Sequence, residues 1–591
     1  MNNESMSTKS MSNTEINKGE ISIIDGQWWK SGTIYQVYPR SFRDSNGDGI
    51  GDLGGLLEKV DYLQWLGVDA VWLSPVYRSP QHDNGYDISD YQDIDPTFGS
   101  LAQLDEVIEA LRTRGMRLIM DLVVNHTSTE HEWFAESRSS LHNAKRDWYI
   151  WRPPREGFAA GESGAEPTNW ESFFSRPAWT LDEATGEYYL HLFAPQQPDL
   201  NWENPEVRQA VYKMMNWWLD RGVGGFRMDV INLISKVYPF DDGPPLADTG
   251  RGNGQAWYQH GPRLHEFLRE MQDAVFAGRD ADLVRVGETP DVTVDQARDL
   301  SDPDQRMLDM VFQFEHVSLD REPDDWKRPV PMDREVVYRN LAEWQNGLAE
   351  RGWNSLYWTN HDQPRTVSRF GDDSPQHWAQ SAKTLASVLY LMRGTAFIYQ
   401  GDEIGMVNMT FASIDDFDDV SAVEYIRAGL ARGRDPLALV NDLSRTSRDN
   451  ARTPMQWTSE ASAGFTSGTP WFAVNPSAAW LSVEAQRNDT QSMLHHVRAV
   501  ITARKQLAAL PNGAFLNVPT GDARVVVYDR IEGEHRVRVV ANLSSDSVAV
   551  DPQIIEPVAQ AGLSEVATLR VGVASPGLLG PWSSRVWTTS P

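Results

Sequence analysis

The chain has 591 residues, of which 40% are hydrophobic and 23% are charged. These proportions are those of an ordinary folded protein, so they allow a sizeable core and exclude wholesale disorder. Its 83 acidic residues outnumber its 54 basic residues and give a formal net charge of −29. A field of that sign repels phosphate backbones and anionic lipid, so we expect no nucleic-acid or membrane partner and a small neutral substrate instead. There is no cysteine, which excludes disulfides and thiolate metal sites.

Residues 1–26 are polar and lack the apolar segment of a signal peptide, so we expect a disordered tail. The sequence contains no apolar run of about 18 residues, the length that a membrane-spanning helix requires. We therefore expect a cytoplasmic protein. We also expect a monomer, although no pattern in the sequence bears on oligomeric state.

From Thr33 onwards, short strand-like runs alternate with helical patterns in which apolar residues recur at spacings of three and four. The strand-like runs are, in order, TIYQVYPRSF, DAVWLSPVY, RLIMDLVVNH, GFRMD, LVRVGE, MVFQFEH, SLYWTNHD and GTAFIYQG. Eight parallel strands that alternate with helices close a (β/α)8 TIM barrel, the α/β fold that we predict. We expect this barrel to comprise residues 27–126 and 199–512.

Two further segments interrupt or follow this alternation. About 70 residues rich in Gly, Pro, Trp and Ser separate the third run from the fourth, which is too long for an ordinary loop. We expect residues 127–198 to form a small inserted domain over the mouth of the barrel. After residue 512, the alternating runs RVVVYDR, HRVRVVANL and RVWTTS are separated by turn residues. This pattern is typical of antiparallel strands and predicts a C-terminal β-sandwich over residues 513–591.

Several strand-like runs end in residues that can do acid–base or nucleophilic chemistry. Arg227 and Asp229 are two positions apart, so on a strand they point the same way, and the guanidinium favours an ionised carboxylate. Glu288 ends an apolar run without an adjacent cation, an arrangement that can keep its proton near neutral pH. Asp362 follows His361 at the end of the seventh run. Because the C-terminal ends of barrel strands share one face, we expect the three carboxyl groups in one pocket.

Two carboxyl groups that flank an acetal are what glycoside hydrolysis requires. We assign Asp229 as the nucleophile, Glu288 as the proton donor and Asp362 as a group that grips ring hydroxyls. A structural ion pair would account for any one of these residues alone. Their positions at the ends of separate strands favour a catalytic site.

The motifs DLVVNH, QPDLN, GFRMDV, VGE and NHDQPR occur in this order along the chain. They resemble the signature regions of glycoside hydrolase family 13, the α-amylase family, and within it the oligo-1,6-glucosidase and α-glucosidase group. The resemblance spans roughly Trp28 to the C-terminus. It implies a retaining double displacement with Asp229 as nucleophile, Glu288 as general acid/base and Asp362 as transition-state stabiliser. It also implies a set of substrate-binding residues, which are Asp83, Tyr86, His126, Phe193, Gln197, Arg227, His361 and Arg448.

The same resemblance implies that Asp83 and Tyr86 seal the subsite for one terminal glucosyl unit, which makes the enzyme exo-acting. Linkage preference in this group is associated with the residue after the nucleophile, here Val230, where relatives specific for α-1,4 bonds tend to carry Thr. A branched apolar group there narrows the aglycone side, an effect of about 1 to 3 kcal/mol. We therefore expect hydrolysis of terminal non-reducing α-1,6-linked glucose from isomalto-oligosaccharides.

Three alternatives stay open. One is an α-1,4-glucosidase, and another is a sucrose-active hydrolase, transglucosidase or isomerase of the same family. Sucrose isomerases usually carry NHDNPR where this chain has Gln363, which makes isomerisation the weaker possibility. A remote alternative is a non-catalytic relative, but this chain retains all three carboxylates.

The stretch DSNGDGIGD places Asp44, Asn46, Asp48 and Asp52 at short intervals, with glycines that allow a tight curl. Hard oxygen donors at this spacing, helped by the Ile50 carbonyl, predict a calcium loop. The stretch also resembles the metal loop of the same group. Because it lies far along the sequence from the carboxylates, we expect a structural Ca²⁺ ion, the alternative being a solvated acidic turn. We expect no organic cofactor.

Overall fold

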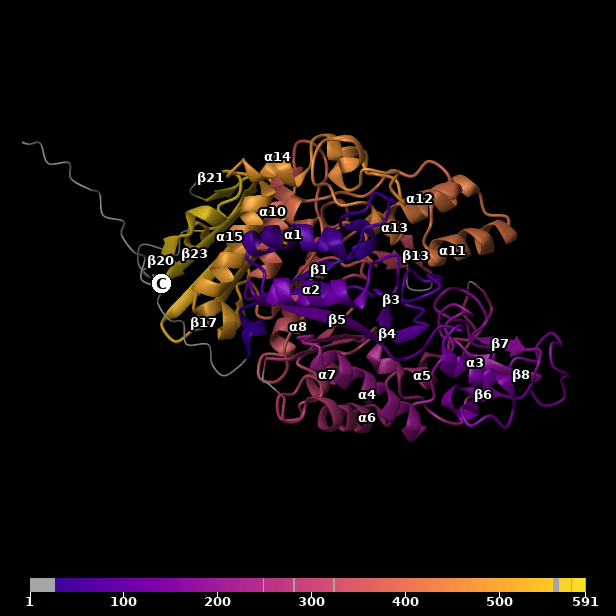
Figure 1. Cartoon of the computed structure of the whole chain (residues 1–591). Coiled ribbons are helices and arrows are strands. Elements are labelled where there is room, and N and C mark those ends of the chain that lie inside the picture. The colour runs from indigo at the N-terminus through magenta and orange to yellow at the C-terminus, as the bar shows by residue number, and fades with distance from the viewer. Residues whose placement is uncertain are drawn as a thin grey trace, which may run out of the picture.

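The computed structural model describes residues 27–247, 249–279, 282–322, 325–555, 563–575 and 577–589. The expected N-terminal tail, residues 1–26, lies outside this part of the chain. Eight strands form one parallel sheet in the order β11–β10–β9–β5–β2–β1–β15–β14. An isolated parallel bridge between Val311 and Asn354 joins the two edges of the sheet. The sheet is therefore closed as a barrel, which confirms the predicted (β/α)8 fold (Figure 1).

All eight barrel strands lie within the runs predicted from the sequence. Their bounds are β1 Thr33–Val37, β2 Ala70–Leu73, β5 Arg117–Val123, β9 Gly225–Asp229, β10 Val284–Glu288, β11 Met310–Phe312, β14 Ser355–Leu356 and β15 Thr395–Tyr399. Strands β1, β2, β9 and β15 are buried at every position, because a barrel covers both faces of its strands. Gly225 has a φ of 139°, and a Cβ there would lie 2.1 Å from the Val284 carbonyl oxygen. The close approach of β9 to β10 therefore requires glycine.

Helices surround the barrel and begin at side chains that cap their first turn. Asp52 caps α1, Ser100 caps α2 and Asn204 caps α4, each by accepting a backbone N–H bond from the first turn. The helices associated with the barrel are α1 Leu53–Leu66, α2 Leu101–Arg112, α4 Pro205–Asp220, α5 Gln255–Tyr258, α6 Leu264–Met271, α7 Val294–Leu300, α8 Arg334–Gly347, α9 Thr366–Phe370, α10 Trp378–Tyr390, α13 Asp449–Arg452, α14 Val483–Arg487, α15 Met493–Gln506 and α16 Ala509–Asn512. Short strand pairs lie in two loops, β3 Tyr77–Arg78 with β4 Asp90–Ile94, and β12 Arg321–Glu322 with β13 Asp325–Pro329.

The segment between β5 and α4 carries its own small sheet. Helix α3 (Glu132–Ser139) precedes an antiparallel sheet of β6 (Trp151–Arg152), β8 (Glu187–Leu190) and β7 (Trp179–Asp182). A hydrophobic cluster in this segment contains Trp170, Trp179 and Tyr188 and reaches Val230 of the barrel. The insertion predicted after the third strand is thus present, while its expected bounds of 127–198 stay a prediction.

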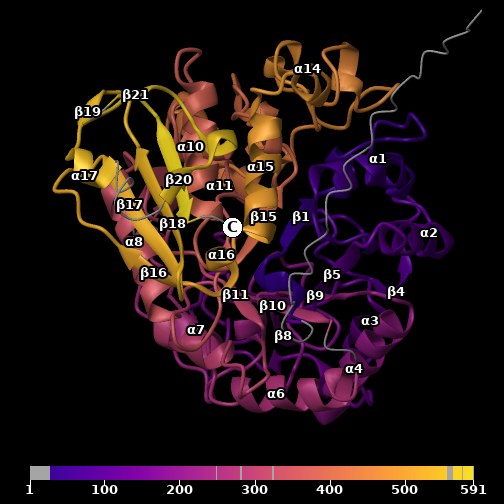
Figure 2. The ribbon, with the colours of Figure 1, turned by 90° about the vertical axis from the view of Figure 1, so that its left-hand side faces the viewer.

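The C-terminal segment forms two antiparallel sheets, as predicted for a β-sandwich. One sheet has the order β16–β17–β18–β23–β20, and the other has the order β19–β22–β21. The bounds of these strands and of the helix among them are β16 Ala514–Asn517, β17 Val525–Glu532, β18 His535–Asn542, β19 Val548–Ala549, α17 Pro552–Ile555, β20 Leu563–Glu565, β21 Ala574–Ser575, β22 Leu578–Leu579 and β23 Ser584–Thr589. Val525 and Val527 of β17 pack with Val548 and Leu579 of the smaller sheet. Tyr528, which follows Val527 on β17, donates its hydroxyl to the Val388 carbonyl of α10 at 2.8 Å. The opposite face of the larger sheet therefore covers the barrel (Figure 2).

The structure contains a helical segment after β15 that was not predicted. Helices α11 (Val420–Ala431) and α12 (Pro436–Thr446) pack around their own cluster, which includes Phe417, Leu439 and Leu443. Figure 1 shows these helices at the same end of the barrel as the inserted sheet and opposite the C-terminal sheets. Within the described residues, no helix combines the length and apolarity needed to cross a membrane.

Candidate active site

Arg227 lies at the centre of the site, on β9, with only 1% of its side chain exposed. Its Nη1 lies 2.6 Å from an oxygen of Asp121 and 2.6 Å from an oxygen of Asp229. Its Nη2 lies 2.5 Å from Oε1 of Glu288. The three carboxyl groups come from β5, β9 and β10, which are neighbours in the barrel. One rigid guanidinium fork therefore holds all three together.

Asp229 and Glu288 share this cation but differ in pKa. Burial raises the pKa of Glu288 to about 8, because Arg227 opposes the effect only in part and nearby carboxylates add to it. Burial also raises the pKa of Asp229, but only to about 6, since Arg227 and a hydrogen bond with Glu288 favour its ionised form. Near pH 7, Asp229 is mainly ionised and Glu288 mainly protonated. These are the states that a nucleophile and an acid catalyst need.

The reason for the protonation of Glu288 differs from the one the sequence suggests. The sequence shows no cation adjacent to Glu288, but the fold brings Arg227 into direct contact with it. The Val230 backbone N–H also donates to Oε2 of Glu288 at 3.1 Å. The high pKa of Glu288 thus arises from complete burial, not from the absence of a neighbouring cation.

Asp362 lies in a different electrostatic setting. Burial acts to raise its pKa, but the guanidinium charges of Arg448 and Arg452 outweigh it and hold the pKa well below the usual carboxyl range. Arg452 donates to Oδ1 of Asp362 at 2.9 Å and Arg448 donates to the same oxygen at 3.2 Å. Asp362 therefore stays ionised throughout the neutral range. Its side chain is 26% exposed, so the carboxylate is accessible on one side.

His361 is held by contacts on two sides. Its Nδ1 lies 2.8 Å from Nε2 of Gln36, and its Nε2 lies 3.3 Å from Oδ2 of Asp362. The Tyr86 ring stacks on the imidazole with the ring centroids 5.2 Å apart and an interplanar angle of 5°. Burial lowers the pKa of His361 to about 3, so the ring is neutral near pH 7.

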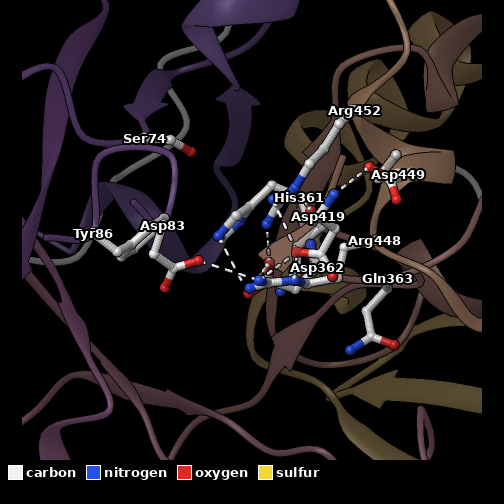
Figure 3. A network of polar contacts seen from close by, with 12 residues as sticks. Ser74, Asp83, Tyr86, His361, Asp362, Gln363, Asp419, Arg448, Asp449 and Arg452 are labelled. Atoms are coloured by element: carbon white, nitrogen blue, oxygen red, sulfur yellow. Dashed lines mark hydrogen bonds and ion pairs between the residues drawn. The ribbon is translucent and has the colours of Figure 1, made fainter. Parts of the chain in front are cut away.

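An ion pair joins two distant parts of the chain across the site. Nη2 of Arg448 lies 3.2 Å from Oδ1 of Asp83, which belongs to the loop between β3 and β4. Figure 3 shows Asp83 and Tyr86 on one side and Arg448, Arg452 and Asp362 on the other, with the dashed contacts between them. Both partners are buried, so the pair joins these two parts of the chain in the interior of the protein.

Three further predicted residues join the same cluster through Asp83. Gln197 donates to Oδ2 of Asp83 at 3.2 Å, and its Nε2 lies 3.2 Å from Nε2 of His126. The Phe193 ring lies 5.0 Å from the His126 ring. The structure therefore brings together the catalytic and substrate-binding residues predicted from the sequence, including Val230 through its bond to Glu288. Their assigned roles stay predictions.

Three residues of the cluster were missed as functional residues. Asp121 lies in a motif that the sequence analysis used, and it accepts bonds from Arg227 and from the Trp72 indole at 2.6 and 2.8 Å. Arg452 follows Arg448 by four positions, the spacing of neighbours on one helical face, and this signal could have identified it. Asp419 contacts both arginines but has no distinguishing pattern in the sequence.

The predicted calcium loop lies apart from these contacts. Its side chains bond backbone groups of the loop, and Asp44 also accepts the hydroxyl of Thr466. Asp44 accepts backbone N–H bonds from Gly47 at 2.7 Å and from Gly49 at 2.8 Å. Asp52 caps α1, and Asn46 and Asp48 each accept a backbone bond two residues further along. In the part of the chain that the structure describes, no group of three or more His, Cys, Asp or Glu side chains is arranged to hold a metal ion. The calcium assignment stays a prediction.

Comparison with known proteins agrees with this geometry. The model of the α-amylase catalytic domain matches residues 36–513. An oligo-1,6-glucosidase of Parageobacillus thermoglucosidasius is 50% identical over 518 residues, which cover 88% of this chain and 90% of the relative. The crystal structure of a Bacillus licheniformis trehalose-6-phosphate hydrolase is 39% identical with a TM-score of 0.87, covering 95% of this chain and 99% of that one. Isomaltulose synthase from Protaminobacter rubrum is 38% identical with a TM-score of 0.88, covering 96% of this chain and all of the other.

The closed barrel carries, at neighbouring strand ends, the pair of carboxyl groups that glycoside hydrolysis uses. The match over most of the chain shows that it belongs to the α-amylase family, glycoside hydrolase family 13.

Proposed function

We propose that this enzyme is a retaining, exo-acting α-glucosidase that removes terminal non-reducing α-1,6-linked glucose from isomalto-oligosaccharides. The observation that carries the proposal is the arginine shared by two carboxyl groups whose pKa values are about 6 and about 8. Relatives from Parageobacillus thermoglucosidasius and Bacillus cereus, 50% and 46% identical, are oligo-1,6-glucosidases and support the same substrate class.

The carboxyl pair suits a double displacement. Ionised Asp229 attacks the anomeric carbon while protonated Glu288 gives its proton to the leaving oxygen, which forms a glycosyl-enzyme. Glu288, now ionised, then takes a proton from water as the water attacks the same carbon, and the bond to Asp229 breaks. The two inversions together retain the configuration of the anomeric carbon. Arg227 contacts both carboxyl groups and stabilises whichever of them is ionised at each step.

The ion pair between Asp83 and Arg448 supports exo action. Each is buried on one side of the cluster, and Tyr86 stacks on His361 beside them. A sugar whose anomeric carbon lies at Asp229 would direct its hydroxyl groups toward these fixed polar groups and toward ionised Asp362. Such contacts would fit a single terminal glucosyl unit.

Val230 supports the α-1,6 preference. It follows the nucleophile with a φ of 37°, in the left-handed region, and its side chain packs at the edge of the inserted segment. Its N–H bonds Glu288, so the valine lies beside the group that protonates the leaving sugar. A contact between Val230 and the aglycone would let its branched apolar side chain restrict which linkage fits.

A substrate panel tests the proposal. Isomaltose, maltose, sucrose, trehalose, trehalose 6-phosphate and isomaltulose are compared at equal concentration by glucose release and by product chromatography. We expect the highest kcat/KM with isomaltose and no sucrose isomer among the products. The Asp229→Ala variant should fold but release no glucose. Preference for maltose or sucrose would contradict the linkage assignment, and normal turnover by the variant would contradict the assigned nucleophile.

A further inference from the structure

Asp419 lies behind the active-site arginines and contacts no predicted catalytic carboxylate directly. It is the N-cap of α11, its side chain is fully buried, and its Oδ2 accepts the backbone N–H of Ala422 at 3.0 Å. A buried carboxylate needs cationic or hydrogen-bonding partners to offset the loss of hydration. Its ion-pair partners are Arg448 and Arg452, and the buried Lys327 also acts on its charge.

The two arginines bridge two aspartates. Arg448 donates from Nε to Oδ1 of Asp419 at 2.7 Å, and its Nη2 lies 2.5 Å from the same oxygen. Nη1 of Arg452 lies 3.3 Å from that oxygen. On the other side, both guanidinium groups bond Oδ1 of Asp362. The buried Asp419 and the partly exposed Asp362 therefore hold the same pair of cations.

Asp419 is itself held in place by the helical segment of α11 and α12. Its backbone N–H donates to Oδ1 of Asp449 at 3.0 Å, and Asp449 lies between the two arginines on α13. Helices α11 and α12 pack on their own cluster, which includes Tyr425 and Leu439. The carboxylate is thus attached to a packed unit and not to a free loop.

We propose that Asp419 is a positioning residue, which fixes Arg448 and Arg452 so that they hold Asp362 and Asp83 in the geometry that grips the glucosyl unit. The inference rests on the proposed function, because it concerns residues assigned to that site. Without Asp419, Arg448 is attracted only by the groups on the sugar side. A guanidinium displaced by about 1 Å disturbs groups that must align with the reacting sugar, a loss of up to about 100-fold in rate.

The chain offers variants that separate positioning from helix capping. Asparagine is as good an N-cap as aspartate, so Asp419→Asn keeps the cap and removes the charge, whereas Asp419→Ala removes both. Asp435 is the matched control because it caps α12 through the Leu437 N–H but is exposed to solvent. The four variants Asp419→Asn, Asp419→Ala, Asp435→Asn and Asp435→Ala are compared by Tm, by isomaltose kinetics and by inhibition with D-glucose.

We expect Asp419→Asn to keep a Tm near that of the wild type while kcat/KM for isomaltose falls about 10- to 100-fold, with a raised KM and weaker inhibition by D-glucose. Both Asp435 variants should keep kcat/KM within about twofold, although Asp435→Ala loses its cap. Full activity of Asp419→Asn, or a loss matched by the fraction of unfolded enzyme, would overturn the proposal.

A crystal structure of Asp419→Asn provides a readout that does not require turnover. The proposal expects Arg448 or Arg452 to shift from its wild-type position toward Asp362 and Asp83, which then attract it unopposed, and unmoved arginines would contradict it. The proposed function would fail through a different result, because the wild type itself would then release no glucose from isomaltose. The arginine positions in the Asp419→Asn structure would still test whether Asp419 positions them.

Discussion

Replacing Glu288 with Gln tests the chemistry most directly. The usual pKa of a glutamate, 4.5, would leave about 0.3% of the side chains protonated at pH 7, whereas a pKa of about 8 leaves about 90% protonated. Burial therefore increases the fraction that can act as an acid by about 300-fold. For the wild type, kcat/KM for isomaltose should rise as Asp229 ionises near pH 6 and fall as Glu288 ionises near pH 8. At pH 9 it should be about 10% of its maximum.

In Glu288→Gln, the proton donor is lost while the volume of the side chain is kept. We expect kcat/KM for isomaltose to fall about 10²- to 10⁴-fold, the usual contribution of a general acid. The loss should be much smaller for 2,4-dinitrophenyl α-glucoside, because its leaving group needs no proton. Glu403→Gln is the control, since Glu403 is also buried with a raised pKa but bonds Tyr35 and Tyr62 outside the cluster. Equal losses for both substrates, or a wild-type profile that is flat from pH 7 to 9, would refute the assignment.

Three further predictions concern specificity, metal and stability. Val230→Thr should lower the ratio of kcat/KM for isomaltose to kcat/KM for maltose by about 10-fold, which is within the range that one small change in a binding pocket produces. An unchanged ratio would show that Val230 does not determine linkage specificity. If the loop of Asp44 and Asp48 binds a structural Ca²⁺ ion, chelation should lower Tm and release calcium measurable by metal analysis, whereas no change in either would show an ordinary turn. Burial raises the pKa of Asp402 to about 7. Between the usual pKa of a carboxyl group and about pH 7, the folded state therefore holds a proton that the unfolded state has released. The free energy of unfolding consequently falls as the pH rises through this range. Asp402→Asn should remove that dependence and raise Tm at pH 8, as monitored by calorimetry, and a steeper dependence in the variant would contradict this reading.

The sequence alone predicted the elements that depend on local pattern. Period-two and helical spacings identified the eight barrel strands and the C-terminal sheets, because a strand or an amphipathic helix exposes its core face at fixed intervals. The polar residues that end those strands then follow from topology, since the C-terminal ends of parallel barrel strands share one face. Asp229, Glu288 and Asp362 were identified in this way. Helices α11 and α12 were not, because no predicted barrel element required them.

Only the tertiary structure decided how these residues act on one another. Asp83 and Arg448 are 365 positions apart, and their contact depends on the packing of the whole barrel. The contact of Arg227 with Asp121 and Glu288, the separated pKa values and the bridging position of Asp419 also depend on distances that no local pattern encodes. How much water a carboxyl group loses on burial depends on the complete fold around it. The protonation state of the site is therefore a property of the folded molecule.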